Sequence, residues 1–210
     1  MKRFEIITEA DARVLQPGET VQLARGGHVT PLAADTLRER RITVVIDGGV
    51  PVDAASLVPK AEIRTLTIGS DHTGIPFRKA LVTFIRGKGI TVVDVGTDST
   101  ESVDYPDIAE AVARRVARGE ADAGIVIDGA GIGSTIAANK IKGIRAAMAT
   151  TDTIARYSRE HNGANVLALG SSLLTLDEAK SIVTTWISTA MREPRYIRRL
   201  SKIGDLERRS

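Results

Sequence analysis

The sequence predicts an α/β protein in which a five-stranded parallel sheet is covered by helices on both faces, with a small N-terminal extension. Two observations lead to this expectation. From Arg64 onward, short apolar runs alternate with stretches of helical periodicity. The runs are apolar at nearly every position, which is typical of strands buried on both faces, and regular alternation of strand and helix favours parallel pairing.

The individual elements follow from these patterns. In the first expected helix, Phe77, Leu81 and Phe84 recur at helical spacing, and Pro106 suits the first turn of the second. The expected strands are 64–69, 90–95, 123–127, 143–148 and 165–169. The expected helices are 76–88, 106–118, 134–140, 152–160, 177–191 and 194–202. Together they predict a three-layer αβα arrangement.

Residues 1–62 differ in composition, because glycine and proline are scattered through them. We expect only a helix at 32–40 and a strand at 42–46 there. A segment of this length buries little apolar surface by itself. We therefore interpret residues 1–62 as an appended or docking module and residues 63–210 as the main domain.

The overall composition excludes several classes of protein. Hydrophobic residues make up 42% and charged residues 26%, which is ordinary for a folded soluble protein. There is no cysteine, which excludes disulfides, thiolate metal ligands and a cysteine nucleophile. No apolar stretch is long enough to span a membrane, and the N-terminus lacks the apolar core of a signal peptide. We therefore expect a cytoplasmic protein with no membrane partner.

The positive charge is local. The chain carries a net +3, but residues 192–210 contain seven basic and three acidic side chains, which leaves a net −1 for the rest. Aromatic residues make up only 3%, so platforms for base stacking are not expected. This pattern argues against a nucleic-acid surface. The arginines either serve a small anion or are solvated.

The most informative motif is the run IVIDGAGIGS at 125–134, in which a strand leads through a glycine-rich turn into a helix. Ligands of open parallel sheets bind at the carboxyl ends of the strands. Glycines there let backbone N–H groups approach an anion, which the helix dipole also favours. A tight turn without a ligand is the structural alternative. A dinucleotide fingerprint fits poorly, because Ser134 stands where its third glycine would be.

Three further motifs contain polar or charged residues that could bind a ligand. Asp71 and His72 follow the first strand, where Asp71 alone would be a helix cap and the pair would bind polyol hydroxyls and a phosphate. His161 ends a helix, where the alternative is a capping histidine stabilised by the dipole. Arg195 and Arg199 share one helix face, which suits a phosphate, although a solvated basic tail is equally consistent.

Taken together, these motifs resemble the type B ribose-5-phosphate isomerase family, which also includes the galactose-6-phosphate isomerase subunits. The resemblance runs from about Thr67 to Ile203, and the order and spacing of its motifs make it specific. The matching segments are 68–74, 101–107, 119–147, 159–171 and 195–199. The resemblance implies a Rossmann-like domain that interconverts ribose 5-phosphate and ribulose 5-phosphate through a cis-enediol, with no cofactor and no metal.

The resemblance also implies roles for individual residues. The catalytic residues would be Asp128 and His161, and the histidine would help to open the sugar ring. The phosphate would be bound by His72, Arg195 and Arg199. The residues implied in substrate binding are Asp71, His72, Tyr105, Gly129, Ala130, Gly131, Gly133, Asn139 and Asn162. The backbone of the glycine loop would hold the developing enediolate oxygen, and the site would be shared between the subunits of a homodimer or tetramer.

The sequence departs from the family pattern at four positions. The family's base is often a cysteine at position 128 or a glutamate at position 134, where this chain has Asp128 and Ser134. Tyr196 replaces a common histidine and Ser172 a common arginine. Asp128 is the best-placed base, as it resembles the aspartate of galactose-6-phosphate isomerase subunits. An Asx-type cap on the glycine turn is the alternative.

Alternatives to the pentose isomerase remain. One is a galactose-6-phosphate isomerase, and another is a non-catalytic protein that binds sugar phosphates. Residues 7–33 also resemble stretches found on enzymes of bacterial microcompartments, which implies encapsulation or contact with a shell protein or a cargo enzyme. An oligomerisation or lid module is the alternative for this segment.

Overall fold

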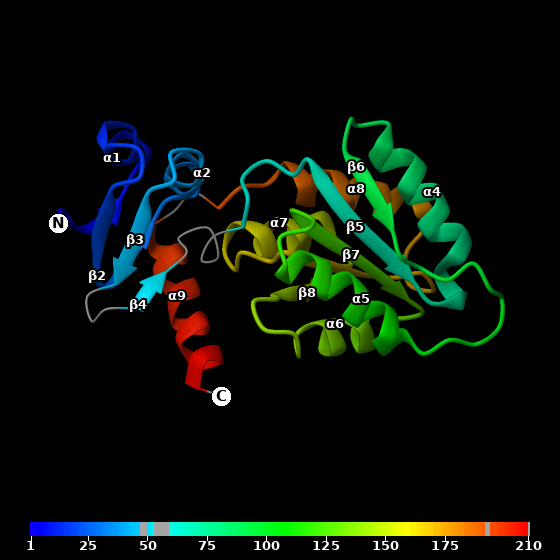
Figure 1. Ribbon diagram of the computed structural model, residues 1–210. Helices are drawn as coiled ribbons and strands as arrows, with labels where there is room; N and C mark the ends of the chain where they lie inside the picture. The colour runs from blue at the N-terminus through cyan, green and yellow to red at the C-terminus, as the bar shows by residue number, and fades with distance from the viewer. Residues whose placement is uncertain (47–49, 53–58, 192–193, 210) are drawn as a thin grey trace. The chain divides into compact units, whose positions relative to one another are not determined.

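The computed structural model describes residues 1–46, 50–52, 59–191 and 194–209 (Figure 1). These residues form two compact units. The first unit contains Met1–Ala61, Glu160–Gly163 and Ala190–Ser210, and the second contains Glu62–Arg159 and Ala164–Thr189. The C-terminal helix, which the sequence-based division placed with residues 63–210, thus groups with the N-terminal segment. None of the helices in the described part combines the length and hydropathy needed to cross a bilayer.

The second unit has the predicted five-stranded parallel sheet. Its strands are β5 (Thr65–Ser70), β6 (Thr91–Asp94), β7 (Ala123–Asp128), β8 (Ala146–Met148) and β9 (Val166–Gly170). They lie in the order β6-β5-β7-β9-β8, and every neighbouring pair is parallel. The strands β7 and β9 are buried at every position, as their sequences predict.

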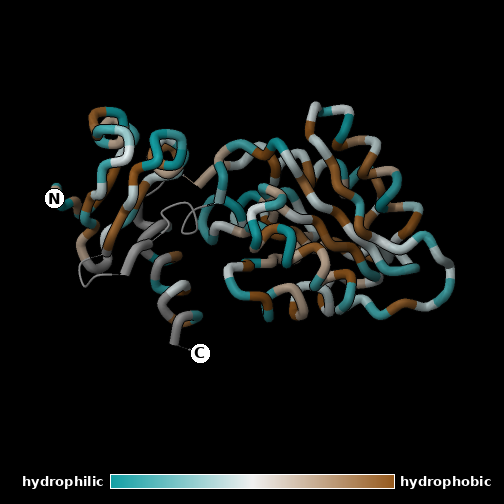
Figure 2. The backbone as a smooth tube through the Cα atoms, in the orientation of Figure 1, coloured by the Kyte–Doolittle hydropathy of each residue, from teal (hydrophilic) through white to brown (hydrophobic). Residues whose placement is uncertain are grey.

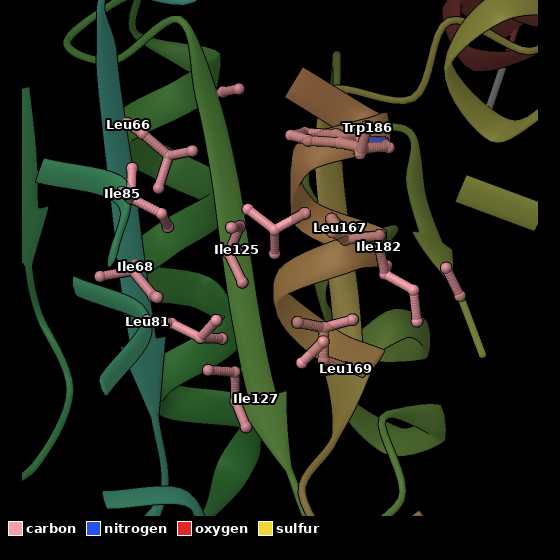
Figure 3. Close-up of a cluster of buried hydrophobic side chains, with 14 of the residues drawn as sticks. Leu66, Ile68, Leu81, Ile85, Ile125, Ile127, Leu167, Leu169, Ile182 and Trp186 are labelled. Atoms are coloured by element: carbon pink, nitrogen blue, oxygen red, sulfur yellow. The ribbon is translucent and has the colours of Figure 1, made fainter. Parts of the chain in front are cut away.

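Helices cover both faces of this sheet, so the three-layer prediction is confirmed (Figure 1). The helices α4 (Ile75–Arg86), α7 (Asp152–Glu160) and α8 (Leu176–Ser188) pack on one face, and α5 (Tyr105–Ala117) and α6 (Ile132–Ala138) pack on the other. Figure 3 shows the larger core, in which side chains of β5, β7 and β9 meet Leu81 and Ile85 of α4 and Ile182 and Trp186 of α8. Hydrophobic stretches, coloured brown, run along the strands of this sheet in Figure 2.

Some predicted bounds in this unit are wrong. The strand expected at 143–148 begins only at Ala146, since Gly143 has a positive φ and Asn139 holds Ala146 by hydrogen bonds. The helix expected at 177–191 ends at Ser188, because the backbone of Thr189 is extended.

The first unit has its own sheet and core. Its strands β1 (Arg3–Ile7), β2 (Thr20–Val29), β3 (Thr43–Ile46) and β4 (Val50–Val52) lie in chain order. The first three are parallel, and β4 is antiparallel to β3. The helices of this unit are α1 (Glu9–Val14), α2 (Pro31–Glu39) and α9 (Pro194–Arg209).

The buried side chains of the first unit correct the expectation that its N-terminal part buries little apolar surface. Ile7, Leu15, Val21, Leu23 and Leu37 are each at most 1% exposed. The helix expected at 32–40 and the strand expected at 42–46 correspond to α2 and β3, whereas β1, α1, β2 and β4 were not expected. The helix α9 packs against β2 and extends to Arg209, beyond the predicted end at 202.

Candidate active site

The carboxyl ends of β5, β7 and β9 meet at one edge of the second unit's sheet. The N–H of Asp71 donates to the carbonyl of Ile127 at 3.3 Å, and the N–H of Ser171 donates to the carbonyl of Asp128 at 2.9 Å. The chain leaves β5 toward β6 on one side, whereas β7 and β9 lie on the other side. Such a reversal of strand order opens a crevice outside the carboxyl ends, where ligands of this fold class bind.

The glycine loop, residues 129–133, is closed by the side chain of Asp128. This carboxylate is 5% exposed at the end of β7. One of its oxygens accepts the N–H of Gly131, and the other accepts the N–H of Ser134 at 3.1 Å. The Asx-type cap, which the sequence left as an alternative, is therefore present, and it fixes the orientation of the carboxylate.

Gly131 is required by this loop for two reasons. Its φ is +80°, in the left-handed region that side chains disfavour. A Cβ there would also lie 3.1 Å from the backbone nitrogen of Gly170 at the end of β9. Glycine thus lets the loop turn back tightly against the neighbouring strand.

The remaining loop N–H groups are available to a ligand. Within the described part of the chain, the N–H groups of Gly129, Ala130, Ile132 and Gly133 donate to no protein acceptor. They follow a buried strand and lie on a loop that Asp128 holds in place. An array of fixed N–H groups can stabilise an oxyanion without reorganising during the reaction.

Hydroxyl groups from two other loops flank Gly129. A Cβ at this position would lie 3.8 Å from Oγ of Ser172, after β9, and 4.0 Å from Oγ1 of Thr73, after β5. Ser172 was noted only as a departure from the family, and Thr73 was not singled out at all. The position of Thr73 directly after the Asp71–His72 pair was the available indication.

Asp71 and His72 are both held by local hydrogen bonds. One carboxylate oxygen of Asp71 accepts the N–H of Thr73 at 2.9 Å and its hydroxyl at 2.6 Å, so the helix-cap interpretation describes its geometry. Nδ1 of His72 accepts the N–H of Val103 at 3.2 Å. In a neutral imidazole the proton then lies on Nε2, which becomes a donor.

Tyr105 lies beside the glycine loop, and its expected role in substrate binding stays a prediction. It begins α5, and its side chain is 40% exposed. A Cβ at Gly133 would lie only 2.5 Å from Cζ of the Tyr105 ring. The glycine therefore allows the ring to pack directly against the start of α6.

Asn139 has a structural role in this geometry. Its amide nitrogen donates to the carbonyls of Thr135 and Ala146, and its amide oxygen accepts the N–H of Ala146 at 2.8 Å. Both ends of the amide are thus used to join the end of α6 to β8. These contacts indicate that Asn139 positions β8 relative to α6, and the expected role of Asn139 in substrate binding stays a prediction.

Sequence reasoning missed Arg78, which organises the same edge of the sheet. Its side chain is 1% exposed and donates to Ser70 Oγ at 3.0 Å and to the carbonyl of Thr97 at 2.6 Å. It also pairs with Asp94 at 3.0 Å and Asp98 at 2.8 Å. A lone arginine on a predicted amphipathic helix gave no indication of this burial.

The remaining predicted site residues lie in the first unit. The ring of His161 stacks on that of Tyr196, with 4.2 Å between centroids, and Arg199 lies 5.8 Å from the Tyr196 ring. Asn162 is exposed beside His161. Arg195 lies on α9, but its side chain is outside the described set.

Comparisons with known proteins agree with this arrangement. A family model described as Ribose/Galactose Isomerase matches residues 66–203. Ribose-5-phosphate isomerase B of Escherichia coli K12 is 41% identical over 147 residues, which cover 70% of this chain and 99% of the relative.

Two solved structures have the same fold. Ribose-5-phosphate isomerase B of Clostridium thermocellum is 48% identical, with a TM-score of 0.68 over 69% of this chain and 98% of that one. The enzyme of Mycoplasma genitalium, solved with bound ribulose-5-phosphate, is 36% identical, with a TM-score of 0.67 over 70% of this chain and 97% of that one. On this family match and these identities, the chain belongs to the Ribose/Galactose Isomerase family.

Proposed function

We propose that the chain is a cofactor-independent aldose–ketose isomerase that interconverts ribose 5-phosphate and ribulose 5-phosphate. The observation that carries this proposal is the glycine loop, whose N–H groups, with no acceptor among the described residues, lie beside the buried Asp128 carboxylate at the carboxyl edge of the sheet. Support also comes from the relatives, which are named ribose-5-phosphate isomerase B, and from the bound ribulose-5-phosphate of one of them.

The chemistry requires a base, an oxyanion site and an anchor for the phosphate. A proton leaves C2 of the open-chain aldose and a proton returns at C1, while a second proton moves from O2 to O1, through a cis-enediolate. In the proposal Asp128 removes the proton, and the loop N–H groups stabilise the enediolate oxygen. Each Asp128 oxygen already accepts one backbone hydrogen bond, and its second lone pair remains for the proton.

In the proposal, the residues implied by the family resemblance bind the other groups of the substrate. His72, Arg195 and Arg199 bind the phosphate, since cationic groups and N–H donors match its oxygens. His161 assists opening of the sugar ring, with Asn162 beside it. Asp71 and Tyr105 contact the sugar in this proposal.

The variant Asp128→Asn tests the base. We expect kcat for ribose 5-phosphate to fall by about 10²–10⁴-fold, the range for loss of a general base. Binding of the sugar phosphate, measured by calorimetry, should be retained. The matched control is Asp177→Asn, which makes the same change at an exposed carboxylate outside the predicted site. A near-native rate in Asp128→Asn, with normal folding, would assign the proton transfer to another group.

A hexose 6-phosphate is the second candidate substrate, as the family includes galactose isomerases. The exposed hydroxyl of Ser172 beside Gly129 favours this candidate, because a small side chain leaves room for a longer sugar. Measurement of kcat/KM for ribose 5-phosphate and galactose 6-phosphate side by side decides between them. Binding of both without turnover would instead identify a sugar-phosphate-binding protein.

We also propose that the protein works in the cytoplasm as a homodimer or tetramer, with residues 1–62 as a docking module. The support is that residues 1–61 lie outside the family match and have a core of their own. Docking to a microcompartment shell or cargo enzyme is the specific form proposed. Residues 1–60 fused to a fluorescent protein should then form foci in a host that makes compartments, and a diffuse signal would refute this form.

A further inference from the structure

A stacked pair of rings in the first unit contains one residue with a proposed catalytic role and one with none. His161 and Tyr196 have ring centroids 4.2 Å apart and an interplanar angle of 29°. The Glu160 carboxylate lies 3.8 Å from His161 Nε2, which is beyond hydrogen-bonding distance. The broad face of Tyr196 lies against the imidazole, and this contact restricts the plane of the His161 ring.

The tyrosine itself is firmly held. It is 8% exposed and packs with Met191 and Leu200 in a small buried cluster. A ring confined in this way is pre-organised, so it limits the orientations open to the side chain stacked on it. The charged group of Arg199 lies 5.8 Å from the same ring, one helical turn along α9.

The loop that carries His161 is held against the same cluster. Gly163 has a φ of +59°, and a Cβ there would lie 2.8 Å from Cδ2 of Leu200 and 3.2 Å from Cε of Met191. Cδ of Pro59, in the N-terminal segment, would be 3.3 Å away. Glycine thus lets the loop approach closely, which brings His161 onto the tyrosine ring.

We propose that Tyr196 is the positioning residue for His161: its buried ring fixes the plane of the imidazole for opening of the sugar ring. This inference rests on the proposed function, in which His161 assists ring opening. Tyr196 makes no contact with the reacting atoms in this account. A misplacement of about 1 Å in a catalytic group can cost roughly 10²-fold in rate, so loss of the stack should be visible in kcat.

The test compares Tyr196→Leu, which removes the ring, with Tyr196→Phe, which keeps the ring and removes only the hydroxyl. We expect kcat for ribose 5-phosphate to fall about 10–100-fold in Tyr196→Leu and to stay within about twofold of wild type in Tyr196→Phe. The inhibition constant of an acyclic phosphorylated hydroxamate, an analogue of the enediolate, should change less than about twofold in both, because it needs no ring opening.

A second measurement does not depend on activity. In a proton NMR spectrum, we expect the ring current of Tyr196 to change the chemical shifts of the His161 imidazole protons. These resonances are identified by their loss in His161→Gln. The shift should persist in Tyr196→Phe and disappear in Tyr196→Leu. If Tyr196→Leu does not fold, Tyr196→Met, an unbranched apolar residue of similar reach, replaces it.

The outcomes separate this inference from the proposed function. Wild-type kcat in a folded Tyr196→Leu protein would overturn the positioning role, as would equal losses of kcat and inhibitor binding, which would place Tyr196 in phosphate binding instead. A fall of kcat in Tyr196→Phe as large as that in Tyr196→Leu would also overturn the positioning role. If the wild-type protein does not turn over ribose 5-phosphate, the proposed function fails, and the resonance shifts still decide whether the stack orients His161.

Discussion

Substitution of Gly131 by alanine perturbs the glycine loop at its tightest point. Two costs are expected. Alanine in the left-handed region costs about 1–2 kcal/mol, and φ here is +80°. The new Cβ also lies 3.1 Å from the nitrogen of Gly170, so the loop must shift by a few tenths of an ångström. Overpacking of this kind costs roughly 1–3 kcal/mol.

Gly89→Ala is the matched control. Gly89 has a φ of +82°, but a Cβ there would meet nothing within 4 Å. It lies between α4 and β6, at the amino edge of the sheet, away from the glycine loop. This variant therefore isolates the backbone cost, and urea denaturation of both variants gives the packing cost by difference.

The functional consequence should appear only at Gly131. Its shift displaces the N–H groups of the loop and the Asp128 carboxylate, which accepts the Gly131 N–H. Loss of one oxyanion donor typically costs about 10²–10³-fold in kcat. We expect a fall of at least about 10²-fold in kcat for Gly131→Ala and a wild-type rate for Gly89→Ala. Equal stabilities and equal rates in the two variants would refute the role assigned to the loop.

Two further predictions concern the frame of the site. Gly96→Ala should destabilise the protein by about 3 kcal/mol or more, because its Cβ would lie 2.0 Å from Nη1 of the buried Arg78; a urea midpoint close to wild type would contradict this packing. Hydrogen bonds from Thr175 to Glu178 hold the pKa of Glu178 below its ordinary value, so their contribution to stability is present above the unfolded pKa and is lost as the pH falls through the lower, folded pKa. Glu178→Gln should therefore lower the urea midpoint more at neutral pH than in acid, and an equal loss at both would show that the charge on Glu178 does not contribute.

Much of the second unit could be predicted from sequence because its strands are buried on both faces. A run such as AGIVID is apolar throughout, so the pattern indicates a central parallel strand without any knowledge of its neighbours. The place of the glycine loop followed from the same pattern, since a strand must end where Gly129 begins. The sequence left open whether Asp128 caps this loop, because an aspartate before glycines fits both a cap and a base.

The first unit was harder to predict because its signals are short or interrupted. The strand β2 contains an irregularity where Phe4 pairs with Leu23 but Ile6 pairs with His28, so the alternation of side chains breaks within the strand. The helix α1 spans only six residues, too few for a periodic pattern to emerge. The stack of His161 on Tyr196 joins residues far apart in the chain, and no local pattern reports such a contact.

The most direct test of the account is turnover of ribose 5-phosphate by the purified protein in deuterated buffer, without added metal or nucleotide, followed by proton NMR. The account predicts ribulose 5-phosphate with solvent deuterium at C1, and a rate that falls by about 10² or more in Asp128→Asn. Binding of ribose 5-phosphate with no ketose formed and no exchange at C2 would contradict it, and would instead identify a protein that binds sugar phosphates without isomerising them.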